Sequence, residues 1–246
     1  MAEDRSVLTR PAPAPARTLT YGVDPDQVID VYPGRSTSGT STDRPAIVLV
    51  HGGFWRPEYE RGHLRGMAAA LADAGWTTYL IEYRRQPGVP ASTFADVHGA
   101  IQASSADRPG SALLLVGHSA GGHLVLHAAS EGLPQVRAVV ALAPVADLGA
   151  AVTRNLDDGA AIAFLGHVPS HRHCPIVRQA PSVPVLILHG DQDGIVPIDM
   201  SRDYVRTHPP ARLQELPGIG HFALVDSQSE AWPMVIQAIA QTAAVG

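Results

Sequence analysis

The sequence predicts an α/β protein with a mostly parallel, doubly wound sheet of about eight strands. Strand-like and helix-like segments alternate through the middle and the end of the chain, as βαβ units require. The segments 46–50 and 113–116 are continuous aliphatic runs, which suit strands buried on both faces of a parallel sheet. With 246 residues, the chain is long enough for one large domain with a sizeable core.

The expected elements follow from hydrophobic periodicity and from the residues that end helices and strands. The helix at 62–75 has apolar residues three to four apart and ends at Gly75, a typical C-cap. The helix at 92–105 begins at Ser92, its expected N-cap. The expected strands are at 19–21, 28–32, 46–50, 76–83, 113–116, 136–143, 184–189 and 212–216. The other expected helices are at 120–131, 199–207 and 224–244.

Composition indicates a globular protein, because 45% of the residues are hydrophobic and only 17% are charged. A net charge of −5 disfavours nucleic acid or an anionic membrane surface as a partner. The single cysteine, Cys174, excludes an intrachain disulfide. No stretch reaches the roughly 20 apolar residues that cross a bilayer, and residues 1–10 do not resemble a signal peptide. We therefore expect a soluble cytoplasmic protein; a homodimer is compatible with the sequence, which does not decide the oligomeric state.

Two segments depart from the regular alternation. Residues 10–17 read Arg-Pro-Ala-Pro-Ala-Pro-Ala-Arg, so we expect residues 1–17 to form a flexible tail outside the core. Residues 18–246 would then form a single domain. Within it, residues 147–181 are too many for an ordinary connection and follow the end of a strand, where ligands bind in open α/β sheets. We interpret this insert as a small cap or lid over the site.

The strongest chemical signal is Gly-His-Ser-Ala-Gly at 117–121, directly after an aliphatic strand and directly before a helix. Such a strand must turn sharply into its helix, and Gly117 and Gly121 lack the side chains that would collide across the turn. Ser119 therefore lies at the tip of the turn. This arrangement is typical of a nucleophilic serine.

A nucleophilic serine needs a base that takes its proton and an acid that orients the base. Asp193 lies in a glycine-containing loop just after an apolar strand, and His221 lies in a glycine-rich loop just after the last strand. The order Ser, Asp, His is that of known hydrolases with this motif. Two other acids remain open at this stage, since Asp191 and Asp147 also follow strand ends. Asp191 lies closer to its strand and is more typical of an aspartate that binds backbone amides.

Acyl transfer also needs N–H donors aimed at the developing oxyanion. The amide of Ala120, at the start of the helix after the serine, is one candidate. The loop after the first aliphatic strand reads His-Gly-Gly-Phe-Trp, and its glycines allow the amides of Gly53 and Phe54 to turn inward. Trp55 and His118, which neighbour these two motifs, are the expected substrate-binding residues, and the aromatic side chains suit an aromatic or acyl substrate.

Two other polar groups have structural explanations. Glu82, Tyr83 and Arg84 close a strand at the same sheet edge, and we expect them to form a hydrogen-bonded cluster that supports the oxyanion loop. Residues 171–174 read His-Arg-His-Cys, but no second ligand cluster accompanies them, so we expect no metal. Cys174 is not expected to be a nucleophile, because no strand–turn–helix frames it.

With these motifs placed, the chain from about residue 19 to its end resembles the α/β-hydrolase superfamily. The His-Gly-Gly-Phe-Trp segment at 51–55 is similar to the HGGxW motif of kynurenine formamidases (arylformamidases), neighbours of the hormone-sensitive-lipase-type esterases. Lipase-type esterases usually carry a third glycine where this chain has phenylalanine, which favours the formamidase-like branch. The acid loop also resembles that of prolyl-oligopeptidase-type peptidases, although the chain has no propeller domain. The resemblance assigns the triad and the oxyanion amides of the loop to Ser119, Asp193, His221, Gly53 and Phe54.

The resulting expectation is a cofactor-independent serine hydrolase acting on a small-molecule substrate. It would cleave a small carboxylic ester or an aryl formamide through an acyl-enzyme. The alternatives are an N-formylkynurenine formamidase specifically, a peptidase-like amidase, and a non-catalytic binding protein with a hydrolase fold. The last is disfavoured because the chain keeps all three members of a triad.

Overall fold

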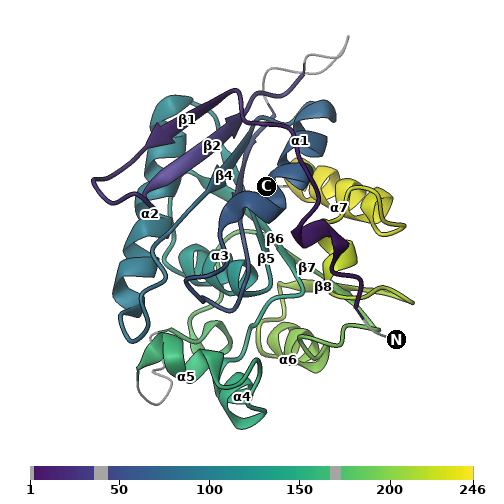
Figure 1. Cartoon of the computed structure of the whole chain (residues 1–246). Coiled ribbons are helices and arrows are strands. Elements are labelled where there is room, and N and C mark those ends of the chain that lie inside the picture. The colour runs from purple at the N-terminus through teal and green to yellow at the C-terminus, as the bar shows by residue number, and fades with distance from the viewer. Residues whose placement is uncertain (1–2, 36–43, 167–172, 246) are drawn as a thin grey trace.

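A computed structural model describes residues 3–35, 44–166 and 173–245. Eight strands form one sheet in the order β1-β2-β4-β3-β5-β6-β7-β8 (Figure 1). The strands β4, β3, β5, β6, β7 and β8 are parallel to one another, whereas β2 pairs antiparallel with both β1 and β4. The predicted mostly parallel α/β fold is therefore confirmed. The strands are β1 (Arg17–Thr20), β2 (Val28–Tyr32), β3 (Ala46–Val50), β4 (Thr78–Ile81), β5 (Leu113–His118), β6 (Val136–Leu142), β7 (Val185–Gly190) and β8 (Arg212–Leu216).

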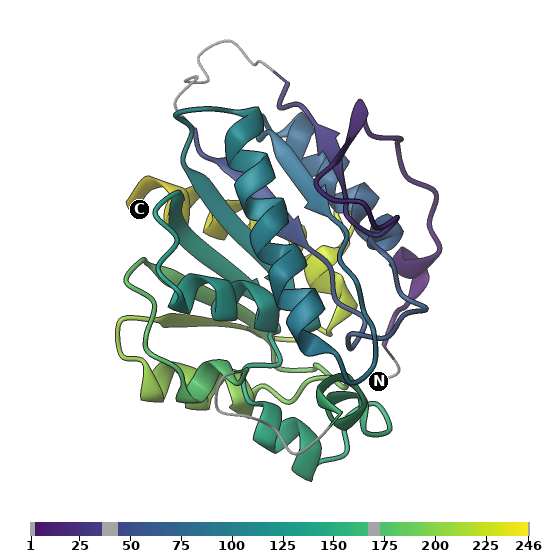
Figure 2. The same ribbon diagram turned by 90° about the vertical axis from the view of Figure 1, so that its left-hand side faces the viewer.

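Helices cover both faces of the sheet, as the continuous aliphatic strands predict (Figure 2). In β3, Val48 and Val50 join the core under one set of helices, while Ile47 and Leu49 join the core on the opposite face. The first face is covered by α2 (Pro90–Asp107), α3 (Ala120–Ser130) and α6 (Asp199–Thr207). The second is covered by α1 (Arg65–Asp73) and α7 (Trp232–Val245).

Several predicted boundaries are wrong, and local sequence features explain two of them. The helix expected at 224–244 is two elements, η4 (Phe222–Val225) and α7, because Asp226 and Ser229 accept backbone amides in a turn between them. The expected cap Ser92 lies inside α2, which begins two residues earlier at Pro90, a residue suited to the first helical position. The first part of the helix expected at 62–75 is the 3-10 helix η2 (Arg61–Leu64).

The prediction of a tail outside the core is also wrong, because residues 3–17 lie against the domain. The short helix η1 (Ser6–Leu8) buries Val7 in the core. The Tyr32 hydroxyl donates to the carbonyl of Pro13 at 2.9 Å. The two terminal nitrogens of the Arg10 guanidinium donate to the Asp226 carboxylate at 2.5 and 2.9 Å. The Pro/Ala tract gave no periodic signal for this packing. We propose that the single domain extends to residue 3.

The insert at 147–181 carries α4 (Leu148–Thr153), α5 (Ala160–Leu165) and η3 (Pro175–Val177). In Figure 1, α4 and α5 lie beside α6 at one end of the sheet. Phe164 on α5 stacks on Trp55, with ring centroids 4.8 Å apart. The insert is therefore joined to the oxyanion loop by a buried aromatic contact.

Candidate active site

Ser119 stands at the turn between β5 and α3 with φ 58° and ψ −119°, a strained conformation for a residue with a side chain. Its amide donates to the carbonyl of Leu142 on the neighbouring strand at 2.8 Å, which holds the turn in place. A Cβ at Gly117 would lie 2.3 Å from the Gly121 carbonyl oxygen. A Cβ at Gly121 would lie 2.1 Å from the Val50 carbonyl oxygen. Glycine at both positions therefore allows the sharp turn that presents Ser119, as the sequence predicts.

Asp193 and His221 meet beside this serine. The Nδ1 atom of His221 lies 2.6 Å from Oδ2 of Asp193, and the side chains are 2% and 0% exposed. The other carboxylate oxygen accepts the amides of Ile195 and Val196, both at 2.8 Å. Burial raises the pKa of Asp193, but the hydrogen bonds from His189 and His221 lower it by a larger amount. The pKa of Asp193 is therefore well below its usual value. The carboxylate is therefore charged and held in a fixed orientation.

The two other candidate acids have structural partners instead. Asp191 accepts the amide of Gly218 at 2.7 Å and so connects the loops after β7 and β8. Asp147 caps α4 by accepting the amide of Ala150 at 3.0 Å. Of the three aspartates, Asp193 is the one whose carboxylate bonds to the imidazole of His221.

The oxyanion loop after β3 has three successive residues with left-handed backbone: Gly53 (φ 105°), Phe54 (φ 50°) and Trp55 (φ 56°). In the part of the chain that the structure describes, the amides of Gly53, Phe54 and Ala120 donate to no protein acceptor. Unpaired backbone donors near a nucleophile are the arrangement that an oxyanion hole requires. The expected oxyanion residues are thus available, and their role stays a prediction.

A buried ionic cluster holds this loop. The carboxylate of Glu82 bonds to Nε2 of His51 at 2.8 Å and accepts the amide of Arg61 at 2.8 Å, while Arg85 pairs with the same carboxylate. Burial raises the pKa of Glu82, but His51 and Arg85 outweigh that effect and lower it to about 2. The Tyr83 hydroxyl donates to the carbonyl of His51 at 2.7 Å. Glu82 and Tyr83 therefore support the oxyanion loop as expected.

Arg84, the third residue expected in that cluster, lies elsewhere. It forms an ion pair with Asp96 at 2.7 Å, and Arg85 takes its place beside Glu82. The strand β4 ends at Ile81, so residues 82–85 do not keep the regular alternation of a strand, in which Glu82 and Arg84 would share a face.

We expect Glu82→Gln to destabilise the protein by about 3 kcal/mol, because it removes the buried negative charge that pairs with the Arg85 guanidinium. Urea unfolding measures the change. The matched control is Glu215→Gln, which removes the exposed Arg202–Glu215 ion pair and should cost less than about 1 kcal/mol. Equal losses for the two variants would contradict the role given to the buried cluster.

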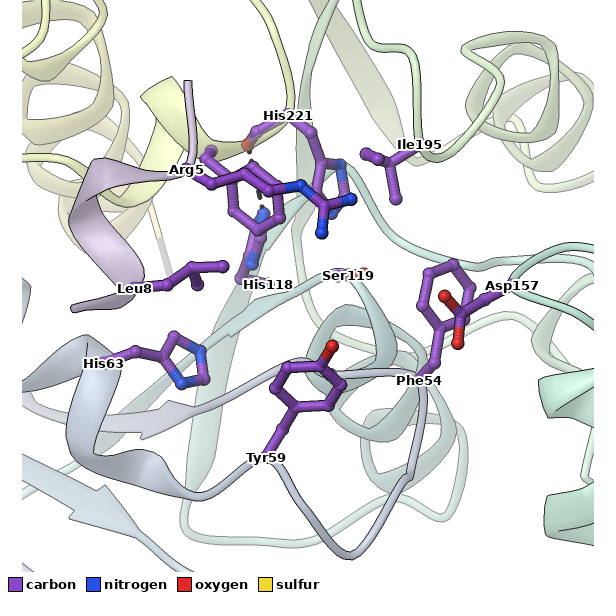
Figure 3. A pocket seen from close by; sticks show the side chains of 12 residues that line it. Arg5, Leu8, Phe54, Tyr59, His63, His118, Ser119, Asp157, Ile195 and His221 are labelled. Carbon is purple, nitrogen blue, oxygen red and sulfur yellow. Dashed lines mark hydrogen bonds between the residues drawn. The ribbon is translucent and has the colours of Figure 1, made fainter. Parts of the chain in front are cut away.

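One cavity of about 60 Å³ brings the candidate groups together (Figure 3). His118 lines it, and its Nε2 donates to the carbonyl of His221 at 3.1 Å. The substrate-binding role of His118 stays a prediction. Burial, followed by the nearby His221, holds the pKa of His118 well below its ordinary value, so this ring is neutral. The residues around the cavity include Ser119, His221, Gly53, Phe54 and His118.

Trp55, for which we predicted a substrate-binding role, lies behind the wall of the cavity. Its side chain is 2% exposed and does not line the cavity. The left-handed backbone of the loop turns its ring between Phe164 of the insert and His123 of α3, at 4.8 and 5.1 Å between centroids. Trp55 therefore joins the oxyanion loop to the cap.

Comparison with known proteins places the chain in a family. Residues 29–207, more than half of the chain, match the BD-FAE family. The chain belongs to this family. Esterase LipC from Mycobacterium tuberculosis is 29% identical over 245 residues, covering 85% of this chain and 60% of LipC. The chain thus spans about 60% of the length of this curated relative.

Solved structures support the fold of this BD-FAE chain. Esterase B from Lactobacillus rhamnosis has a TM-score of 0.76 at 18% identity, covering 95% of this chain and 87% of that one. A thermophilic esterase from the Planctomycetes species Thermogutta terrifontis has a TM-score of 0.71 at 22% identity, covering 92% of each chain. The predicted α/β-hydrolase fold is confirmed.

The family match ends at residue 207, so both His221 and residues 3–28 lie outside it. Sequence reasoning missed several residues that line the cavity. Tyr59 and His63 follow the oxyanion loop, and burial lowers the pKa of His63 to about 4, so that ring is neutral. The other missed residues are Arg5, Leu8, Asp157, Ile195 and Phe222. Ile195 and Phe222 lie in the loops that carry Asp193 and His221, and Tyr59 and His63 follow shortly after residues 51–55. Arg5, Leu8 and Asp157 belong to no motif.

The remaining predictions concern metals, thiols and membranes. The described residues contain no cluster of three or more metal-ligating side chains, and His171 and Arg172 lie outside them. Cys174 is buried, which raises the pKa of its thiol, and its sulfur accepts the amide of Leu148 at 3.2 Å. In the same part of the chain, no helix has the length and apolarity to cross a membrane.

Proposed function

We propose that this BD-FAE chain hydrolyses small carboxylic esters through an acyl-enzyme on Ser119. The observation that carries the proposal is the shared cavity, where a strained serine, a histidine bonded to a buried aspartate and unpaired amides meet. The names of LipC and of the esterase structures support the same reaction class.

In the proposed mechanism, Oγ of Ser119 attacks the carbonyl carbon while Nε2 of His221 takes its proton. The carbonyl π electrons move to oxygen, which the amides of Gly53, Phe54 and Ala120 bind. Collapse of this intermediate expels the alcohol, which receives the proton from His221. Water then attacks the acyl-enzyme by the same route and releases the acid and free Ser119.

Asp193 acts through His221 in this scheme. Its charged carboxylate accepts the Nδ1–H of His221, so that Nε2 carries the lone pair that takes the serine proton. The same negative charge stabilises the imidazolium that forms after proton transfer. The two amides on the other oxygen keep the carboxylate from rotating.

The size of the cavity favours a short acyl group. Its volume is about 60 Å³, well below the roughly 150 Å³ that holds a benzene molecule. Aromatic side chains line it, including those of Phe54, Tyr59 and Phe222. We propose that the acyl group occupies the cavity, that the leaving group faces its mouth, and that the insert contributes to leaving-group choice through Asp157.

An aryl formamide is the second candidate, because formyl is the smallest acyl group and the oxyanion loop has the HGGxW pattern of arylformamidases. N-formylkynurenine is the specific test compound for that branch. Ester and formamide hydrolysis use the same groups and differ in the leaving amine, which must be protonated by His221 before it departs.

We expect kcat/KM for p-nitrophenyl esters to fall about tenfold or more from acetate to octanoate, since each extra methylene exceeds the space beside Ser119. Formyl anilides and N-formylkynurenine in the same series decide the formamide branch, which fails if their turnover is negligible beside that of acetate. A preference for octanoate over acetate would contradict the small-acyl assignment.

A further inference from the structure

The N-terminal segment reaches the two loops that carry the proposed acid and base. One carboxylate oxygen of Glu3 accepts the amide of Gly194 at 2.8 Å and the amide of His221 at 3.0 Å. Its other oxygen accepts the His221 amide at 2.9 Å. A single side chain thus connects the residue after Asp193 with the backbone of His221, which lies 218 positions away in sequence.

These contacts lie next to the Asp193–His221 hydrogen bond. The Asp193–His221 bond joins the loop after β7 to the loop after β8, and its geometry depends on how these loops lie relative to each other. Glu3 bonds to both loops next to this pair. Hydrogen bonds to a charged carboxylate are stronger than bonds between neutral groups, so this bridge restrains the loops where alignment matters for proton transfer.

The loop after β8 leaves room for the Glu3 carboxylate at Gly220. A Cβ at Gly220 would lie 2.6 Å from Oε2 of Glu3, so a side chain there would displace the carboxylate. At Gly194, the corresponding Cβ would be 3.7 Å from Glu3, an ordinary contact. Glycine at 220 therefore leaves the space that Glu3 occupies.

Other contacts hold the segment independently of Glu3. Val7 is buried in the core, and Arg10 pairs with Asp226 through two hydrogen bonds. Arg5 lies over the Phe222 ring at 5.5 Å, and both Arg5 and Leu8 line the cavity (Figure 3). Removal of the Glu3 carboxylate should therefore leave the segment in place and change mainly the two loops.

We propose that Glu3 is a positioning residue for the hydrolytic site: its carboxylate bridges the loops of Asp193 and His221 and holds the histidine in line with Ser119. The inference rests on the proposed esterase function, in which His221 is the base. It assigns a role in the reaction to a segment outside the family match.

The experiment compares Glu3→Ala, Glu3→Gln and Asp4→Ala in the full chain. Asp4 is the matched control, because this neighbouring carboxylate accepts the Ser6 amide and does not reach either loop. With p-nitrophenyl acetate, we expect Glu3→Ala to lower kcat about tenfold with KM within about twofold, because a misplaced base slows the chemical step. Glu3→Gln keeps one acceptor oxygen and should give a smaller loss; Asp4→Ala should match the wild type.

Two further measurements distinguish a positioning role of Glu3 from a loss of folded enzyme and from a failure of the proposed esterase function. Titration with a fluorophosphonate counts competent sites, so that kcat refers to folded enzyme alone. Amide hydrogen exchange follows peptides containing residues 194 and 221, and it reports the bridge even if no ester is a substrate. An inactive wild type would overturn the esterase proposal and, with it, the role of Glu3; faster exchange in Glu3→Ala would still establish the bridge as a contact.

Gly220→Ala provides a second, independent perturbation. Because its methyl group displaces the Glu3 carboxylate, we expect it to lower kcat as Glu3→Ala does. The double variant should then lose little more than either single variant, as expected when two changes remove one interaction. Unchanged kcat in Glu3→Ala, unchanged exchange at the two amides, or full additivity of the two changes would each overturn the proposal.

Discussion

Replacement of Ser119 by alanine should lower kcat for p-nitrophenyl acetate by about 10⁶-fold, the scale seen when a triad enzyme loses its nucleophile. Without Oγ no acyl-enzyme forms, and the oxyanion amides alone give a small residual rate. The fold should survive, because alanine replaces serine at φ 58° with a backbone strain of the same kind. Steady-state rates and thermal unfolding of the purified variant measure the two effects.

Ser92→Ala is the matched control for this substitution. Ser92 lies on α2 away from the cavity, and its hydroxyl donates to the carbonyl of Val89. We expect this variant to keep the wild-type kcat. A fluorophosphonate should add its mass to the wild type and to Ser92→Ala but leave Ser119→Ala unlabelled. Full hydrolysis by Ser119→Ala would exclude the proposed mechanism, and labelling of another residue would identify a different nucleophile.

The serine turn and the two loops could be predicted because each depends on local pattern. Ser119 follows an aliphatic strand and lies between glycines, and the loops of Asp193 and His221 follow strand ends that parallel pairing brings to one edge. The topology of the sheet thus brings three motifs that are far apart in the sequence to one edge. Asp191 and Asp147 remained open from sequence, since the choice among acids depends on which carboxylate faces the imidazole.

Two features that the sequence did not reveal depend on contact between residues far apart in sequence. The bridge from Glu3 to His221 has no periodicity and no motif to reveal it. The direction of the Trp55 ring depends on left-handed backbone at a residue other than glycine, which composition does not indicate. In both cases packing against distant elements decides the outcome.

Glu3 and the Trp55–Phe164 stack also show how the site is enclosed. The N-terminal segment closes one side of the cavity with Arg5 and Leu8, and the insert reaches it with Asp157. Neither segment carries a member of the proposed triad or a proposed oxyanion amide. The walls of the cavity are therefore completed by segments other than the strands that carry the proposed triad.

Asp193→Asn should lower kcat by about 10⁴-fold with little change in the fold. The asparagine oxygen can still accept the amides of Ile195 and Val196, so its NH₂ group takes the position of Oδ2. That group donates to Nδ1 of His221, which must then carry a lone pair, and the proton moves to Nε2. The base is thereby placed in the wrong tautomer. Asp147→Asn, which keeps an N-cap on α4, is the control and should retain the wild-type kcat.

The same variant should change how stability depends on pH. The folded-state pKa of Asp193 lies below its value in the unfolded chain, which is about 3.9. The charged carboxylate therefore stabilises the fold above about pH 4, and this contribution is lost as the pH falls toward the folded-state pKa. We expect the stability difference between wild type and Asp193→Asn to be constant near neutral pH and to shrink below about pH 4. Urea unfolding of both proteins across this range measures it; a difference that grows on acidification would mean that the carboxylate is protonated in the folded site, contrary to its role beside His221.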